Sequence, residues 1–147
     1  MLNEIFNPMC INLSLKSNTK TGVFGELVET ISVLNPTLDD RELLDAVISR
    51  ESKMNTIIRP GIAVPHGYSS KINGIIGAIG FSQAGIKYDE VSQDPVNLFF
   101  LLLLDEYSRE KHLYFLSRLL DLLNSPDFSK IGGMGNPEDV YNLLSSF

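Results

Sequence analysis

The chain has 147 residues, of which 44% are hydrophobic and 20% charged, a balance typical of a globular protein rather than a disordered or coiled-coil chain. This length suits a single domain, 1–147, with a core of its own. The net charge is −6, from 12 basic and 18 acidic residues, so no broad positive field is available to bind nucleic acid.

Membrane and disulfide classes are also excluded. The longest aliphatic and aromatic run, Leu98 to Leu104, is far shorter than the roughly 20 residues that cross a bilayer, and no basic stretch leads into an apolar run at the amino terminus. We therefore expect a cytoplasmic protein without direct membrane insertion. A single cysteine, Cys10, excludes an internal disulfide and a cysteine-based zinc site. Two histidines without an H-E-x-x-H motif, and no glycine-rich nucleotide motif, predict neither a metal site nor a cofactor.

Two helices are predicted in the first third of the chain. Apolar residues recur at helical spacing from Phe24 to Ile31, and this helix ends near Asn35-Pro36, because proline disfavours helix in the residue before it. Thr37 offers a side-chain oxygen to cap the second helix, which ends around Arg50 to Ser52. Its apolar stripe is Leu43, Leu44, Val47 and Ile48.

The middle of the chain predicts a sheet. Turn and strand alternate through Thr56–Ile58 and Gly61–Gly67, where short apolar pieces are punctuated by glycine and proline. Ile75–Ser82 and Val96–Leu104 are apolar on both alternating faces, as expected for inner strands covered by helices on each side. The sequence therefore predicts an α/β fold, a single domain with a mixed central β-sheet flanked by helices on both faces.

Two further helices are predicted in the last third. A long one is capped near Ser108 and ends before Pro126, and a short one starts near Pro137. The inward stripe of the long helix is predicted to be His112, Leu116, Leu119, Leu120 and Leu123.

His66 is the first candidate for chemistry. Pro65 before it has a fixed φ and no amide hydrogen, and Gly67 after it lets a backbone or a ligand approach closely, so the imidazole is held in place at a turn. The alternative is a histidine that only bonds a neighbouring carbonyl.

His112 and Arg50 are the other candidates. His112 faces inward at the amino end of the long helix, where a neutral imidazole can donate a hydrogen bond to an anion. Arg50 ends the inward stripe of the second helix, and its planar guanidinium suits a phosphoryl group. The alternatives are a histidine at the rim of the core and a cation that answers the helix dipole.

A hydrolase is a third and weaker interpretation. Gly80-Phe81-Ser82-Gln83-Ala84 approximates a nucleophile elbow around Ser82, but hydrolases of that fold are much longer than this chain.

The segment from Arg50-Glu51 through Thr56 to Gly61-Ile62-Ala63-Val64-Pro65-His66-Gly67 resembles the type-2 IIA component of the bacterial phosphoenolpyruvate-dependent sugar phosphotransferase system. This is the fructose and mannitol class, which includes the nitrogen-regulatory IIA proteins. Downstream, Asp94-Pro95-Val96 before the hydrophobic strand and His112-Leu113 opening a leucine-rich helix follow the family order.

The resemblance implies a phosphocarrier. The histidine that accepts the phosphoryl group corresponds to His66, the second active-site histidine to His112, the arginine to Arg50 and the threonine to Thr56. The donor would be the phosphocarrier protein HPr and the acceptor a IIB component on a separate chain. Within this scheme Pro65 and Gly67 hold the acceptor nitrogen in line.

Two functions are compatible with the resemblance. The first is sugar uptake of the fructose or mannitol class, and the alternative is a nitrogen-regulatory type of protein whose phosphorylation state controls partner binding. The chain departs from many relatives at Ile57-Ile58-Arg59-Pro60, where a glycine-containing stretch is common, and at Tyr68, where a basic or small residue is common. Both departures flank His66.

Overall fold

The computed structural model describes residues 1–147, and its centre is a six-stranded sheet in the order β1-β5-β6-β3-β2, with β4 pairing beside β3 on β6. Parallel and antiparallel pairs both occur, so the sheet is mixed. The strands are β1 (Phe6–Asn12), β2 (Ile57–Arg59), β3 (Ile62–Ala63), β4 (His66–Tyr68), β5 (Ile75–Ile86) and β6 (Val96–Leu104). The helices are α1 (Lys20–Leu34), α2 (Asp40–Lys53), α3 (Arg109–Asn124) and α4 (Pro137–Leu144), with 3-10 helices η1 (Leu2–Glu4) and η2 (Pro126–Gly133).

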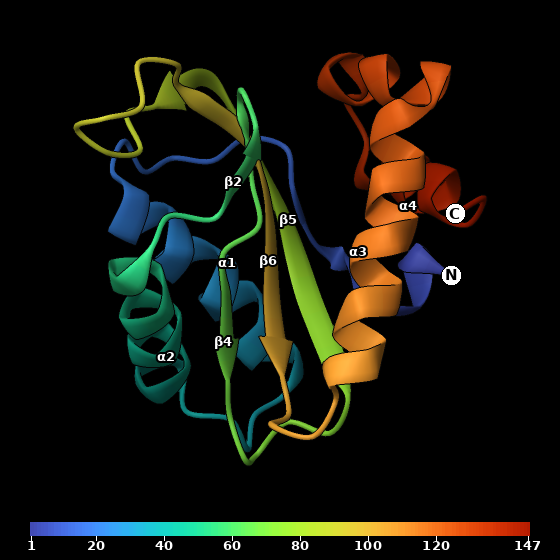
Figure 1. Ribbon diagram of the computed structural model, residues 1–147. Coiled ribbons are helices and arrows are strands. Elements are labelled where there is room, and N and C mark those ends of the chain that lie inside the picture. Colours follow the sequence, from blue (N-terminus) through green and yellow to red (C-terminus); the bar gives the residue numbers. More distant parts are fainter.

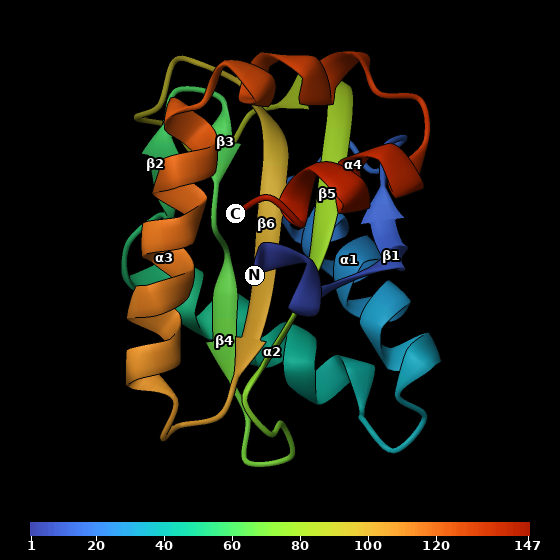
Figure 2. The ribbon, with the colours of Figure 1, turned by 90° about the vertical axis from the view of Figure 1, so that its right-hand side faces the viewer.

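Helices cover both faces of this sheet, which confirms the predicted α/β class. Figure 1 shows α1 and α2 on one face and α3, α4 and both chain ends on the other. Seen from the second face, α3 lies over the side of the sheet that contains β2, β3 and β4, whereas α4 lies in front of β5, toward β1 (Figure 2). None of the helices combines the length and hydropathy needed to cross a bilayer.

Strand β6 divides the core into two halves. Phe99, Leu101 and Leu103 belong to the cluster under α1 and α2, whereas the alternating residues Leu98, Phe100 and Leu102 belong to the cluster under α3 and α4. This alternation follows from the period of two along a strand. The apolar run Leu98 to Leu104 in β6 is therefore buried on both of its faces, as the sequence predicts.

Some local predictions are wrong. Helix α2 is capped by Asp39, whose carboxylate accepts hydrogen bonds from the amides of Arg41 and Glu42, so the cap is not Thr37. In α3, Leu120 is 49% exposed, and Phe115 and Leu122 are buried instead, because the inward face is rotated from the predicted stripe.

The amino-terminal strand and the setting of His66 were also missed. Strand β1 was not predicted at all, and His66 begins a short strand, β4, where a turn was expected. Strands β3 and β4 both run parallel to β6 and are separated only by Val64 and Pro65. His66 therefore lies at a break between two short strands that share one neighbour.

Candidate active site

Gly67 lets helix α2 lie directly on the backbone of β4. A Cβ atom at Gly67 would come within 2.9 Å of the Val47 nitrogen and 3.1 Å of the Ala46 Cβ. Any larger side chain would force the strand and the helix apart. The close approach predicted for this glycine is therefore made by the backbone of a helix.

His66 and His112 lie against each other across the opposite face of β4. In the register of the sheet His66 is the partner of Leu102, which belongs to the core under α3. His112, in the first turns of α3, faces it with a ring centroid distance of 5.1 Å and an interplanar angle of 59°. The structure thus brings together the two histidines that the sequence singled out.

The hydrogen bond of the His66 ring determines which of its nitrogens is free. Nδ1 lies 3.0 Å from the Val64 carbonyl oxygen. Because a carbonyl only accepts, Nδ1 carries the hydrogen in the neutral ring, and the lone pair is on Nε2. His66 is buried, with 9% of its surface exposed.

Both imidazoles are kept neutral by their surroundings. Burial is the main cause that lowers the pKa of His66 below 6.5, and the positive charge of Arg50 lowers it further against the opposing effects of the Val64 carbonyl and Glu51. The pKa of His112 is lowered by burial, by His66 and by Arg50. A neutral imidazole near pH 7 is the form that can act as a nucleophile.

Arg50 lies in the last turn of α2 and folds back over the end of its own helix. Its Nη1 donates to the Met54 carbonyl at 2.9 Å, which leaves other guanidinium hydrogens free for an anion. The positive charge of Arg50 lowers the pKa of both His66 and His112. Arg50 is therefore linked to the histidine pair through its charge.

Thr56 stands behind these residues in a buried network that the sequence did not reveal. Its hydroxyl donates to Glu51 Oε2 at 2.7 Å, and its amide donates to Glu51 Oε1 at 3.1 Å. The Tyr88 hydroxyl lies 3.1 Å from Thr56 Oγ1, and Lys20 forms an ion pair with Glu51 at 3.1 Å. The Thr56 hydroxyl hydrogen is thus already committed, and direct support of a phosphoryl group by Thr56 stays a prediction.

One sequence signal could have revealed Glu51. Leu43 and Val47 are buried on the inward face of α2, and Glu51 follows at the same four-residue spacing. A carboxylate at an inward position needs partners. Glu51 was noted only as part of the Arg50-Glu51 pair, and no role in the site was predicted for it. Lys20 and Tyr88 belong to distant segments, and nothing local indicated them.

Helix α3, which carries His112, is anchored at both ends. At its start, Asp105 accepts hydrogen bonds from the Gly74 amide and the Ser108 hydroxyl, each at 2.7 Å. At its end, Arg59 donates to the Leu123 carbonyl at 3.0 Å. The unusual Arg59 therefore has a structural role, since it binds the carbonyl end of α3 to β2.

Tyr68, the other departure, stands beside the acceptor histidine. Its ring makes an edge contact with His66, with a centroid distance of 6.0 Å and an angle of 86°, and it is 40% exposed. Tyr68 therefore forms part of the exposed surface beside His66.

Other candidate positions lie elsewhere and have ordinary structural roles. Ser82 is buried and accepts a hydrogen bond from the Gly85 amide, so it does not present a nucleophile as a hydrolase would require. Cys10 is buried, which raises the pKa of its thiol, and no group of three His, Cys, Asp or Glu side chains is placed to bind a metal ion.

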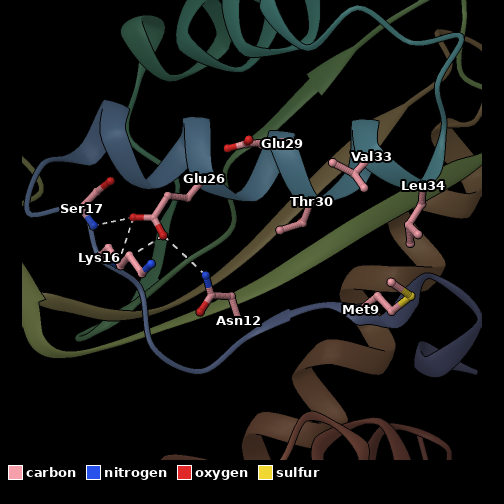
Figure 3. A pocket seen from close by; sticks show the side chains of 9 residues that line it. All are labelled: Met9, Asn12, Lys16, Ser17, Glu26, Glu29, Thr30, Val33 and Leu34. Atoms are coloured by element: carbon pink, nitrogen blue, oxygen red, sulfur yellow. Dashed lines mark hydrogen bonds between the residues drawn. The ribbon is translucent and has the colours of Figure 1, made fainter.

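A pocket of about 570 Å³ lies between β1 and α1 (Figure 3). Its main anchor is Glu26, whose carboxylate accepts hydrogen bonds from the amides of Lys16 and Ser17 and the side chain of Asn12. Met9, Val33 and Leu34 line its other end (Figure 3). The histidine pair does not line this pocket.

The chain is similar in sequence to a known protein family. Residues 4–147 match the model of the family described as "Phosphoenolpyruvate-dependent sugar phosphotransferase system, EIIA 2". A nitrogen regulatory protein of Bradyrhizobium diazoefficiens is 28% identical over 98% of this chain and 94% of its own length. The fructose-specific EIIABC component of Bacillus subtilis is 30% identical over 88% of this chain, which spans only 20% of that protein.

Solved structures share the fold. The crystal structure of the nitrogen regulatory protein IIA-Ntr from Neisseria meningitidis has a TM-score of 0.86 at 24% identity and covers 97% of each chain. The IIAMtl chain of Escherichia coli, solved in complex with phosphorylated IIBMtl, has a TM-score of 0.79 at 19% identity, covering 97% of this chain and 99% of its own.

Proposed function

The chain belongs to the EIIA type-2 family of phosphocarrier domains in the phosphoenolpyruvate-dependent sugar phosphotransferase system, and from this premise we propose that His66 is its phosphoryl acceptor. The observation that carries this proposal is the hydrogen bond from His66 Nδ1 to the Val64 carbonyl, with His112 facing the same ring. That bond leaves the Nε2 lone pair as the nucleophile. We name HPr, a histidine-phosphorylated carrier, as the donor.

Phosphoryl transfer to this nitrogen balances without a further reactant. Nε2 of His66 attacks the phosphorus of the donor phosphohistidine, a new N–P bond forms as the donor N–P bond breaks, and the departing imidazole keeps the electron pair. The His66 ring then carries a positive charge, because Nδ1 still holds its hydrogen. The Val64 carbonyl accepts a hydrogen bond from that charged ring and stabilises it.

Arg50 and His112 supply the charge and the donors that the phosphoryl oxygens need. The transferred group passes through a loose transition state with charge spread over its oxygens, so fixed donors matter more than covalent chemistry. The guanidinium has free N–H groups, and neutral His112 has one. Pro65 and Gly67 hold β4 at the break and against α2, which fixes the position of Nε2.

Labelling with phosphorylated HPr tests this assignment. We expect an acid-labile, alkali-stable phosphate on the parent protein and none on His66→Gln, because the proposed nucleophile is the Nε2 lone pair of His66. Far-ultraviolet circular dichroism checks that the variant is folded. Equal labelling of His66→Gln and the parent protein would show that the acceptor is a different residue.

For the role of the phosphorylated chain, we propose regulation of partner binding, the alternative to sugar uptake. The nitrogen regulatory protein of Bradyrhizobium diazoefficiens aligns over 94% of its own length, whereas this chain matches only 20% of the fructose-specific EIIABC component of Bacillus subtilis. The comparisons support sugar uptake less well. Transfer to a IIB component on a separate chain, as the E. coli IIAMtl complex suggests, stays the competing proposal.

Offering the phosphorylated chain to purified fructose-class and mannitol-class IIB components separates the two roles. A regulator should keep its phosphate over the time in which a fructose-class IIA protein, run in parallel, discharges to its own IIB. Discharge at a comparable rate would overturn the regulatory proposal and favour sugar uptake. The assignment of His66 would be unaffected by either result.

A further inference from the structure

A continuous chain of hydrogen bonds connects a buried carboxylate to the acceptor imidazole. Glu51 accepts from the amide and the hydroxyl of Thr56. The Thr56 carbonyl accepts from the Val64 amide at 2.9 Å, and the Val64 carbonyl lies 3.0 Å from His66 Nδ1. Glu51 is therefore three residue-to-residue links from the ring whose orientation sets the position of Nε2.

The cost of burying Glu51 indicates that it has more than a packing role. It is 6% exposed and lies in the last turn of α2, where the helix dipole disfavours a negative charge. Lys20, at the start of α1, offsets this cost through its ion pair with Glu51, and its ammonium also lies 4.1 Å from the centre of the Tyr88 ring. The Tyr88 hydroxyl completes the set by contacting Thr56.

The same network determines where Arg50 can lie. Arg50 precedes Glu51 in α2, and its guanidinium bonds the Met54 carbonyl, within the turn that Thr56 closes onto Glu51. A shift of that turn would move both the guanidinium and the Val64 carbonyl. The Arg50 guanidinium and the Val64 carbonyl thus both depend on the buried hydrogen bonds between Glu51 and Thr56.

We propose that Glu51 is a positioning residue for phosphoryl transfer, which acts through Thr56 to fix the Val64 carbonyl that orients His66. The inference rests on the proposed function, since it assigns a support to the same acceptor. Thr56 is then a positioning residue as well, and its hydroxyl serves Glu51.

Charge provides a second route by which Glu51 acts on His66. Arg50 and Glu51 from α2 act on the ring through their charges, whereas His112 from α3 and Tyr68 from its own strand lie against it. Among these, Glu51 is the negative charge that raises the pKa of His66, and the causes acting on His112 do not include it. The positive ring that forms on transfer is therefore favoured by Glu51.

The first experiment compares the rate of labelling by phosphorylated HPr in Glu51→Gln, Thr56→Val, Thr56→Ser and the parent protein. We expect Glu51→Gln and Thr56→Val to slow labelling by about tenfold, equivalent to about 1.4 kcal/mol, and Thr56→Ser to restore most of the rate. Glu26→Gln is the matched control, because the Glu26 carboxylate also accepts hydrogen bonds from backbone amides but lies away from His66. This variant should be labelled at the parent rate.

The second experiment follows the two histidine rings by NMR as the pH is changed, and it needs no donor protein. Glu51→Gln should lower the pKa of His66 and leave that of His112 within error of the parent value. A merely structural loss would broaden or shift both rings together. Thr56→Val keeps the charge, so it should change the rate with a smaller change in the His66 titration.

These readouts separate the inference from the function on which it rests. Labelling of His66→Gln would overturn the assignment of the acceptor. The positioning role alone would be overturned if the parent protein is labelled on His66, Glu51→Gln and Thr56→Val are labelled at the parent rate, and Glu51→Gln leaves the pKa of His66 unchanged. If Glu51→Gln does not fold, Thr56→Val and Thr56→Ser decide the outcome, and equal rates for these two would overturn the proposal.

Discussion

Two glutamates, Glu51 beside the histidine pair and Glu26 beside the pocket at β1, hold their loops by accepting backbone amide hydrogens. Glu26 accepts from the amides of Lys16 and Ser17, and Glu51 accepts from the amide of Thr56. They differ in their surroundings. Glu26 is partly exposed and bounds an open pocket, whereas Glu51 is buried and linked by hydrogen bonds to His66. The same local device therefore stabilises a loop in one region and supports the proposed chemistry in the other.

The largest effect on transfer, after loss of the acceptor itself, is expected at His112. His112→Gln replaces the imidazole that faces His66 with a flexible amide whose N–H is no longer held in place, and should slow phosphoryl transfer by about 100-fold, the scale found when one fixed donor is lost from a charged transition state. Rapid-quench labelling gives the rate. Ser117→Ala on the exposed face of α3 is the control, and a parent-like rate in His112→Gln would confine the chemistry to the β4 and α2 side.

Gly67→Ala tests how closely the site region is packed. Its Cβ would strike the backbone of α2, so we expect a loss of about 2 kcal/mol in the free energy of unfolding, measured with urea, together with slower transfer. Gly25→Ala in α1 is the matched control, since its Cβ would meet only Leu44 at 3.9 Å, and it should gain up to about 1 kcal/mol. Equal stability of the two variants would contradict the close packing of β4 on α2.

Acid should destabilise the two regions in separate pH ranges. The pKa values of His66 and His112 are lowered in the folded chain, so the unfolded chain binds more protons and stability falls as the pH drops below about 6.5. The loss is at most about 1.4 kcal/mol per histidine at pH 5.5, the free energy of protonating an unfolded histidine.

The pKa of Glu26 is also lowered, because the hydrogen bonds from Ser17 and Lys16 outweigh the opposing effect of burial. The stabilisation that ionised Glu26 provides is fully present above about pH 4.5, the usual pKa of a glutamate. It is lost as the pH falls through the lower pKa of Glu26 in the folded chain. Urea unfolding between pH 7.5 and 3.5 should show both falls. The double variant His66→Gln/His112→Gln should lack the fall in stability below about pH 6.5, and Glu26→Gln should reduce the fall below about pH 4.5. If each variant instead altered the other fall, the two regions would not titrate as expected.

The smallest effect is expected from Glu26→Gln at neutral pH. A glutamine keeps one acceptor oxygen, so the free energy of unfolding should fall by about 1 kcal/mol while the transfer rate stays at the parent value. Urea titration and labelling measure the two quantities on one preparation. A tenfold slower transfer in this variant would mean that the pocket region and the histidine pair are coupled.

The parts of the site that the sequence revealed are those encoded locally. His66 is flanked by Pro65 and Gly67, and the apolar periodicity of the long helix predicts that His112 faces inward. The structure places these two rings 5.1 Å apart, with the charge of Arg50 in reach of both. The predicted setting of His66 was wrong, since this residue begins a strand instead of occupying a turn.

The parts that the sequence did not reveal depend on contacts between distant segments. Lys20, Glu51 and Tyr88 meet because α1, α2 and the segment after β5 converge, and no local pattern specifies that convergence. Strand β1 was missed for a different reason. It is an edge strand that contains Pro8 and shows alternating exposure only in part, so its sequence lacks a clear strand period.

The two-ended attachment of α3, by Asp105 at one end and Arg59 at the other, has a consequence for signalling. A helix tethered in this way resists displacement when about two negative charges arrive on His66. The backbone outline should therefore be nearly the same before and after modification, and a reader protein would have to sense electric potential instead of shape. For a regulator of the proposed kind, such discrimination would weaken steeply as ionic strength rises, so its output would depend on the salt content of its surroundings.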